Sequence, residues 1–268
     1  MRSSNRFYQR EKSGQPYRLG WSVAIVLLAV LLLVMGRTAS AADVDPDELL
    51  KQIDERLRPP SAEIFRRITN IRPKGQRRVI VLYTVYMGEQ GQLATVLEPA
   101  DRYGRTLLRK KNGSLWLYRP DKKEYTKMND RQSFIGGAFN NADILRVDFH
   151  REFEAEILEE SDGQYLLELL PLDPSHVYEK VLMRVDINTS IPLSVEYYIA
   201  GGIKLKTIRF DKMKGFKNGF TRPELITTES FINPRYRSEM VFGKIRPRDF
   251  APEVATLSFM PKIKNLFK

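Results

Sequence analysis

The sequence predicts a mainly β fold of the α+β class, in which one short helix accompanies a long meander of antiparallel strands. Runs rich in β-branched and aromatic residues recur along the chain, as is typical of strands. Turn signals such as Asn112-Gly113 and Asp162-Gly163 lie between the runs and supply the positive φ angles of tight hairpins. A single sheet of about ten or more strands curls or closes, so we expect a curved sheet or partial barrel.

The first 41 residues predict a secretory signal peptide. Basic residues between Arg2 and Arg18 precede an uncharged apolar run over 21–35, and residues 39–41 (ASA) form a small-residue cleavage site. The run is shorter than the ~20 residues that a membrane span needs; an uncleaved inner-membrane anchor is the alternative. Either way, residues 42–268 are exported to the periplasm. No break in composition divides them, so we expect a single domain there.

A short amphipathic helix is predicted at the start of the exported part. Asp45 can cap its N-terminus and Pro46 suits its first turn, while Pro59-Pro60 ends it. Four apolar residues at helical spacing share one face: Leu49, Leu50, Ile53 and Leu57.

Strand periodicity begins at Ser61. The run over 77–87 (RRVIVLYTVYM) is apolar on both faces, whereas a sheet with one solvated face alternates polar and apolar residues. Something must therefore cover its second face, and the N-terminal helix is available to cover the inner face of a curved sheet. The runs that follow are 92–98, 106–110, 114–119, 124–128, 149–158, 165–172, 181–187, 193–199, 205–210, 220–231 and 236–245.

Residues 131–145 (RQSFIGGAFNNADIL) break the strand pattern. Gly136-Gly137 is flexible, and large apolar side chains flank it at Phe134, Ile135 and Phe139. Two interpretations stand at this point: a loop that fills the protein's own core, or a mobile flap over a pocket.

No catalytic constellation is visible. The chain has no cysteine, which excludes disulfides, a thiolate nucleophile and iron–sulfur clusters. Its two histidines, His150 and His176, lack the H-x-x-x-H spacing of zinc enzymes. Neither a nucleotide-binding loop nor the strand-to-helix turn of serine hydrolases is present. We therefore expect a protein that is not an enzyme and that uses neither a cofactor nor a metal.

Positive charge is concentrated toward the C-terminus. The chain has a formal net charge of +11, and residues 203–268 carry 15 basic and six acidic side chains. Such a surface can face anionic lipid or simply be the solvated face of a β protein. Export argues against a nucleic-acid partner.

Several motifs resemble those of the outer-membrane lipoprotein-sorting family, the LolA-like carriers. The residues that carry the resemblance are 105–109 (RTLLR), 113–120 (GSLWLYRP), 132–139 (QSFIGGAF), Asp143, 191–198 (IPLSVEYY) and 205–211 (LKTIRFD). The sequence departs from the family pattern at Ala138, where relatives commonly carry an acid. Arg66 and Arg67 are the candidates for the strand arginine that holds the lid in LolA.

The resemblance implies a LolA/LolB-like half-open antiparallel β-barrel with a helical lid over an apolar cavity. The cavity would receive the acyl chains of lipoproteins or other envelope lipids for transfer toward the outer membrane. An inner-membrane transporter would load the carrier and an outer-membrane acceptor would unload it. The alternative is a membrane-anchored lipid-sensing or scaffolding protein that uses the same fold to bind a protein partner.

Burying an acyl chain gains ~0.8 kcal/mol per CH₂, so the expected ligand contacts are apolar and aromatic. The same residue types also fill ordinary protein cores, and the sequence does not reveal which strand face points inward. The candidate acyl-binding residues are Val81, Tyr83, Trp116, Tyr118, Phe134, Ile135, Phe139, Val195 and Tyr197.

Overall fold

The computed structural model describes residues 44–267 except 146–147, 175, 217–218 and 234. The predicted signal peptide and its alternative, the membrane anchor, lie outside the described residues. Within the described part, no helix is both long enough and apolar enough to span a bilayer.

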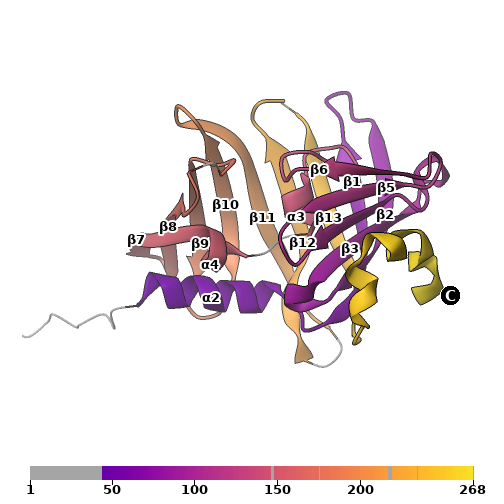
Figure 1. Ribbon diagram of the computed structural model, residues 1–268. Helices are drawn as coiled ribbons and strands as arrows, with labels where there is room; N and C mark the ends of the chain where they lie inside the picture. The colour runs from indigo at the N-terminus through magenta and orange to yellow at the C-terminus, as the bar shows by residue number, and fades with distance from the viewer. Residues whose placement is uncertain (1–43, 146–147, 175, 217–218, 234, 268) are drawn as a thin grey trace, which may run out of the picture. The chain divides into compact units, whose positions relative to one another are not determined.

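A single antiparallel sheet of 13 strands, which is not closed, forms the body of the unit from Asp45 onward (Figure 1), and the predicted fold class is confirmed. The first meander contains β1 (Ala62–Ile71), β2 (Arg77–Tyr86), β3 (Gly91–Glu98), β4 (Thr106–Lys110), β5 (Leu115–Arg119) and β6 (Glu124–Met128). The second contains β7 (Phe153–Ser161), β8 (Gln164–Pro171), β9 (Lys180–Asp186), β10 (Pro192–Ile199), β11 (Ile203–Gly215), β12 (Thr221–Ser230) and β13 (Arg237–Pro247).

The two meanders join where the first strand pairs with the last. β1 and β13 are antiparallel, with Ala62 opposite Pro247 and Ile71 opposite Arg237. Every other neighbouring pair in the sheet consists of consecutive strands, so β6 and β7 form the two edges. The expected half-open barrel is therefore two hairpin ladders connected by a single long-range strand pairing.

Among the described residues, three helices lie on the inner face of the curved sheet: α2 (Pro46–Leu57), α3 (Asn141–Leu145) and α4 (Phe149–Glu152). The Asp45 side chain caps α2 by accepting a hydrogen bond from the Asp47 amide, as the sequence predicts. The four predicted apolar residues of α2 are all buried, and the helix packs against α4, β7 and β12 (Figure 1).

The predicted strand over 149–158 is in fact a helical turn followed by a strand. Residues Phe149–Glu152 form α4, and β7 begins at Phe153. The cause is a tertiary contact, because the Asp54 carboxylate on α2 accepts hydrogen bonds from the amides of Phe149 and His150. The sequence around residue 150 gives no indication of this contact, because Asp54 lies about 95 positions away in the chain.

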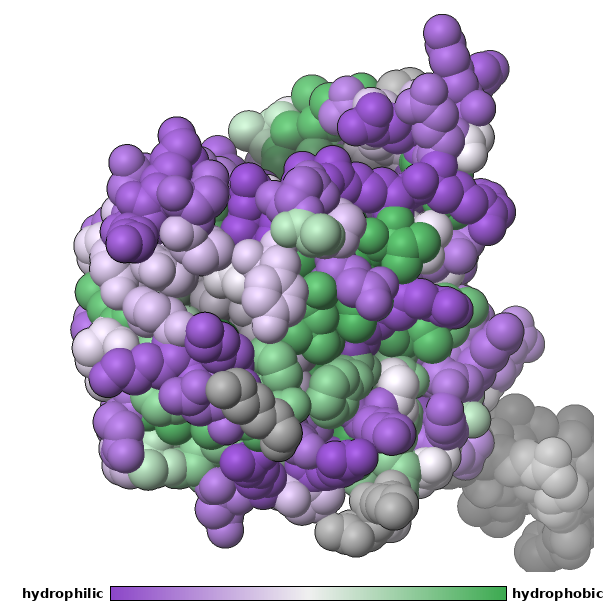
Figure 2. Space-filling view, turned by 90° about the vertical axis from the view of Figure 1, so that its right-hand side faces the viewer, coloured by the Kyte–Doolittle hydropathy of each residue, from purple (hydrophilic) through white to green (hydrophobic). Residues whose placement is uncertain are grey.

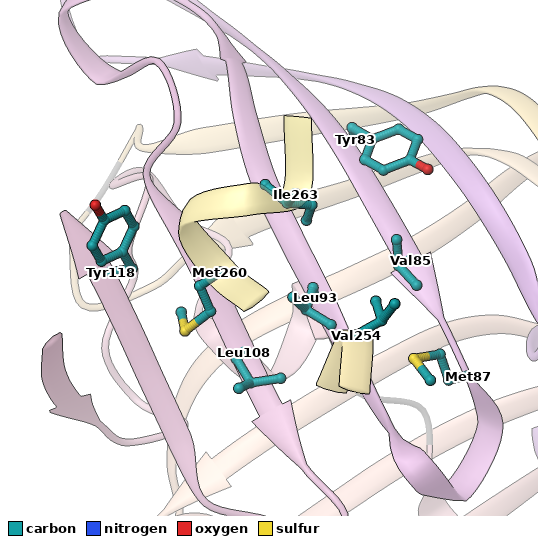
Figure 3. Packing of buried hydrophobic residues seen from close by; sticks show 9 residues of the cluster. All are labelled: Tyr83, Val85, Met87, Leu93, Leu108, Tyr118, Val254, Met260 and Ile263. Carbon is teal, nitrogen blue, oxygen red and sulfur yellow. The ribbon is translucent and has the colours of Figure 1, made fainter. Parts of the chain in front are cut away.

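The outer face of β2 to β5 is covered by the C-terminal segment. Two 3₁₀ helices, η4 (Pro252–Ala255) and η5 (Leu257–Leu266), lie across these strands. Two shorter 3₁₀ helices, η1 (Gly88–Gln90) and η2 (Ala100–Arg102), precede and follow β3 in the chain. Figure 3 shows the resulting cluster, which consists of Tyr83, Val85, Met87, Leu93, Leu108, Tyr118, Val254, Met260 and Ile263. In the view from this side of the molecule, hydrophobic residues gather in the middle of the face (Figure 2).

The two apolar faces of β2 are thus explained. Its odd-numbered residues, such as Tyr83 and Val85, pack beneath the C-terminal segment. Its even-numbered residues point inward, because side chains alternate along a strand and Thr84 and Tyr86 line the internal cavity. The strand therefore belongs to two separate apolar clusters.

Candidate functional site

A cavity of ≈ 650 Å³, partly open to the surface, lies between the helices and the inner face of the sheet. Both meanders contribute to its wall: Ile64, Arg66, Thr84 and Tyr86 come from the first, and Tyr197, Ile208, Phe210, Arg222, Ile226 and Phe242 from the second. The end of α2 and most residues of α3 and α4 line the remaining side, and these three helices are called the lid below. A volume of this order falls within the ~300–1,000 Å³ typical of ligand pockets.

Aromatic and aliphatic side chains dominate the wall. The large apolar contributors are Leu57, Ile64, Tyr86, Phe139, Ile144, Leu145, Phe149, Phe153, Leu172, Tyr178, Tyr197, Ile208, Phe210, Ile226 and Phe242. Such a lining favours alkyl chains over water, because each buried CH₂ contributes ~0.8 kcal/mol.

The Arg66 side chain connects the sheet to the lid. Its guanidinium donates hydrogen bonds to the Ile144 carbonyl at 2.7 Å and to the Thr84 hydroxyl at 2.6 Å. Burial lowers the pKa of Arg66 to about 10. Arg67, the other candidate for this role, is exposed on the opposite face of β1, so the structure selects Arg66 as the strand arginine that contacts α3.

Arg222 is the second buried arginine of the wall. It donates a hydrogen bond to the Leu57 carbonyl at the end of α2, at 2.8 Å, and its guanidinium carbon stacks 3.8 Å from the centroid of the Phe242 ring. Burial and the nearby positive charge of Arg66 lower the pKa of Arg222 to about 9. Sequence analysis missed this residue; the only signal was an arginine within an otherwise strand-like run.

An ion pair fastens α3 to β11. The Lys206 ammonium contacts both oxygens of the Asp143 carboxylate at 2.6 Å, and each side chain is only 4% exposed. Burial alone would lower the pKa of Lys206, but the adjacent Asp143 carboxylate and Tyr178 hydroxyl raise it. The Tyr178 hydroxyl also accepts a hydrogen bond from the Asn140 side chain. The acid of the family motif at Asp143 therefore anchors the lid.

The loop before α3 packs against β1 and β13. Asn70 donates to the Gly136 carbonyl at 3.0 Å, and the Ala138 amide donates to the Ser238 hydroxyl at 2.9 Å. Gly137, at φ +89, lies so close to Asn70 that an added Cβ would meet its side-chain oxygen at 2.0 Å. Hydrogen bonds between the loop backbone and the side chains of Asn70 and Ser238 therefore hold the loop on the sheet.

Two of the nine predicted acyl-binding residues, Phe139 and Tyr197, line the cavity. Val195 is fully buried two residues from Tyr197 and shares its face of β10. Phe134 and Ile135 are buried in the loop but do not line the cavity. The structure therefore brings these five together on the inner side of the sheet, with two in direct contact with the cavity.

The other four predicted residues belong to the outer face. Tyr83 and Tyr118 pack against the C-terminal segment, and alternation along β2 and β5 places Val81 and Trp116 on that same face. None of the four lines the cavity. The prediction grouped residues of both faces because the sequence does not reveal which face of a strand points inward.

Neither histidine is part of a metal centre in the described chain. His150 contacts Asp47 at 3.2 Å on the surface, and His176 lies beside Glu152 and the Phe153 ring at the cavity edge. No group of three or more potential metal ligands is found among the residues that the structure describes.

Comparison with known proteins shows which family model and which solved structures this chain resembles. A family model described as "Uncharacterized protein" matches residues 88–262, more than half of the chain. No curated protein matches the sequence significantly. A LolA superfamily protein from Nitrosomonas europaea is 25% identical, with a TM-score of 0.72 over 81% of this chain and 99% of that structure.

Two further solved structures share the fold. A domain from Vibrio parahaemolyticus, described as a putative outer membrane lipoprotein-sorting protein domain, is 18% identical with a TM-score of 0.69, covering 81% of this chain and 98% of its own. A DUF1329 family protein from Desulfovibrio piger is also 18% identical, with a TM-score of 0.71, covering 81% and 100%. The chain therefore belongs to the family that this model describes, and its fold is similar to that of the LolA superfamily protein.

Proposed function

We propose that the protein is a periplasmic carrier that binds the acyl chains of lipoproteins or other envelope lipids and transfers them toward the outer membrane. The observation that carries the proposal is the ≈ 650 Å³ cavity, which is partly open to the surface and walled mainly by aromatic and aliphatic side chains. The LolA-like fold supports it, because this is a fold of binding and carrier proteins.

An alkyl chain is the natural occupant on energetic grounds. Leaving a sixteen-carbon chain in water costs on the order of 12 kcal/mol, from ~0.8 kcal/mol per CH₂. A carrier that crosses an aqueous compartment must therefore supply an apolar enclosure, and no catalytic group is needed. An inner-membrane transporter that loads the cavity and an outer-membrane acceptor that empties it complete the proposed route.

Lipid extraction from natively purified protein tests the proposal. Residues 42–268 are purified from an envelope fraction, extracted with organic solvent and analysed by mass spectrometry, which should detect a long-chain lipid at about one molecule per protein. Ile226→Trp, which places a large ring in the cavity wall, should remove most of it. Leu170→Trp serves as the matched control, because Leu170 is 49% exposed on β8.

An empty wild-type protein that also takes up no fluorescent acyl probe would contradict the carrier function. The alternative, a membrane-anchored lipid-sensing or scaffolding protein, would then be tested by identifying its protein partner. Equal lipid content in Ile226→Trp and Leu170→Trp would show that the lipid binds outside the cavity.

A further inference from the structure

Two buried cations face the cavity without a counterion. Arg66 is 5% exposed and Arg222 is 4% exposed, and both line the wall. Their guanidinium carbons lie 5.6 Å and 3.8 Å from the centroid of the same Phe242 ring. Neither forms an ion pair with any acidic side chain that the structure describes.

The acidic side chains of the wall have partners of their own. Asp143 is bound to Lys206, and Asp148 lies 3.5 Å from Arg58. Asp130 contacts Arg109 outside the wall, and Glu152 lies 3.5 Å from His176. The two arginines instead donate to the neutral oxygens of two backbone carbonyls and one hydroxyl.

This arrangement is unusual, because buried charges in proteins are normally paired. Lys206, another buried cation in the described part of the chain, behaves differently, because it contacts both oxygens of a carboxylate. Two guanidinium groups close enough for one to lower the pKa of the other repel each other in a medium of low dielectric constant. An anion placed between them would relieve both the repulsion and the lost hydration.

The arginines also retain unused hydrogen-bond donors. The Nε atoms of Arg66 and Arg222 are both buried and have no partner. A guanidinium presents its N–H groups in a planar fork that matches the two oxygens of a carboxylate or phosphate. The apolar wall around them, including Ile208, Ile226 and the Phe242 ring, suits the alkyl chain to which such a group is attached.

We propose that Arg66 and Arg222 bind the acidic group of an anionic amphiphile, a long-chain carboxylate or phosphate, whose chain lies along the aromatic wall. This inference rests on the proposed function and narrows its ligand class, because an uncharged lipid would leave both cations unpaired. The arginine pair thereby selects the headgroup, and the rest of the cavity selects the chain.

Competition binding with headgroup-matched probes tests the inference. Dodecanoic acid, dodecyl phosphate and dodecanol are each used to displace a fluorescent acyl probe from the mature protein, and inorganic phosphate is tested alone. Either acidic amphiphile should bind at least about tenfold more tightly than dodecanol, the gain of one charge-assisted hydrogen bond. The tighter of the two identifies the headgroup, and inorganic phosphate should not displace the probe at millimolar concentration.

Arg222→Gln should abolish the preference for the acidic amphiphiles over dodecanol, which is read as the ratio of their affinities for the same variant. Arg209→Gln is the matched control, because Arg209 is an exposed arginine on β11 that does not line the cavity; it should behave like wild type. The wild-type comparison of acid with alcohol needs no variant, so the inference is testable even if Arg222→Gln does not fold.

Equal affinity of the wild-type protein for dodecanoic acid, dodecyl phosphate and dodecanol would overturn the inference and leave the proposed function standing. Failure of all three amphiphiles to displace the probe would overturn both. Displacement by inorganic phosphate alone would overturn the assignment to an amphiphile, since the chain would then add nothing to binding.

Discussion

Asp54 is a fully buried carboxylate that holds two helices together. It accepts hydrogen bonds from the amides of Phe149 and His150 and pairs with Arg58 at 3.0 Å. Asp54→Ala leaves both amides without an acceptor, so it should lower the free energy of unfolding by about 1–3 kcal/mol. Urea denaturation measures the change, and Glu55→Ala at the next, exposed position is the control. An equal effect of the two substitutions would refute the capping role.

The Lys206–Asp143 pair gives the second residue-scale prediction. Asp143→Asn leaves a buried ammonium without its counterion and should cost about 3–5 kcal/mol. The double variant Asp143→Asn/Lys206→Met removes both charges and should recover part of that loss. Asp211→Asn, at an exposed position of β11, should change the stability by less than about 0.5 kcal/mol. If Asp143→Asn and Asp211→Asn have the same free energy of unfolding in urea, the Lys206–Asp143 pair does not stabilise the packing of α3 on β11.

The sequence was least informative about individual site residues, because it does not show on which face of a strand each one lies. Arg66 and Arg67 are adjacent and chemically identical, and only the direction of the strand face separates the buried contact with Ile144 from an exposed position. Because side chains alternate along a strand, either the odd-numbered or the even-numbered residues can point inward, and the sequence alone does not distinguish the two. The candidate list combined Tyr83 with Tyr197 for the same reason, although they lie on opposite faces of the sheet.

At the scale of elements, the loop before α3 yields a prediction from two neighbouring glycines. Both have positive φ, but an added Cβ at Gly136 meets nothing within 4 Å, whereas at Gly137 it meets Asn70 at 2.0 Å. Gly136→Ala should therefore cost about 1–2 kcal/mol from backbone strain alone. Gly137→Ala should cost about 1–3 kcal/mol more, because the Asn70 contact must shift. Equal stabilities in urea would show that the loop does not pack on β1.

The C-terminal segment is one of the elements that the sequence did not predict. The two apolar faces of β2 indicated that a second cover exists, but residues 257–266 contain Pro261 and form a 3₁₀ helix without a clear period. Its position depends on the outer-face cluster and on Arg248, which donates to both Glu63 and the Leu266 carbonyl. Such contacts join segments far apart in the chain and leave no local pattern.

Met260 tests whether this segment is part of the core. Its side chain is fully buried between η5 and the strands beneath it (Figure 3), so Met260→Ala should lower the free energy of unfolding by about 2–5 kcal/mol. Lys262→Ala, at an exposed position of the same segment, should have little effect. A stability of Met260→Ala close to that of Lys262→Ala would mean that the segment contributes little to folding.

For the whole molecule, the hairpins were predictable from the sequence, and the pairing that joins the two meanders was not. Turn signals such as Asn112-Gly113 specify which consecutive strands pair, because the information is local. The pairing of β1 with β13 joins residues more than 160 positions apart, and no turn specifies it. That single pairing brings the two meanders to opposite sides of one cavity, with Tyr86 contributed by the first and Phe242 by the second.

Because both meanders supply the cavity wall, a ligand inside it should stabilise both. At a free concentration of about 100 times its Kd, dodecanoic acid stabilises the native state by about 2.7 kcal/mol. Amide hydrogen exchange measured by mass spectrometry should then slow most in β2, β11 and β12 and least in η5, which does not line the cavity. The cavity-filled variant Ile226→Trp should show no change. Slowing confined to η5 and β5 would instead place the ligand on the outer face, beside Tyr83 and Tyr118, and would show that the C-terminal segment is the true lid.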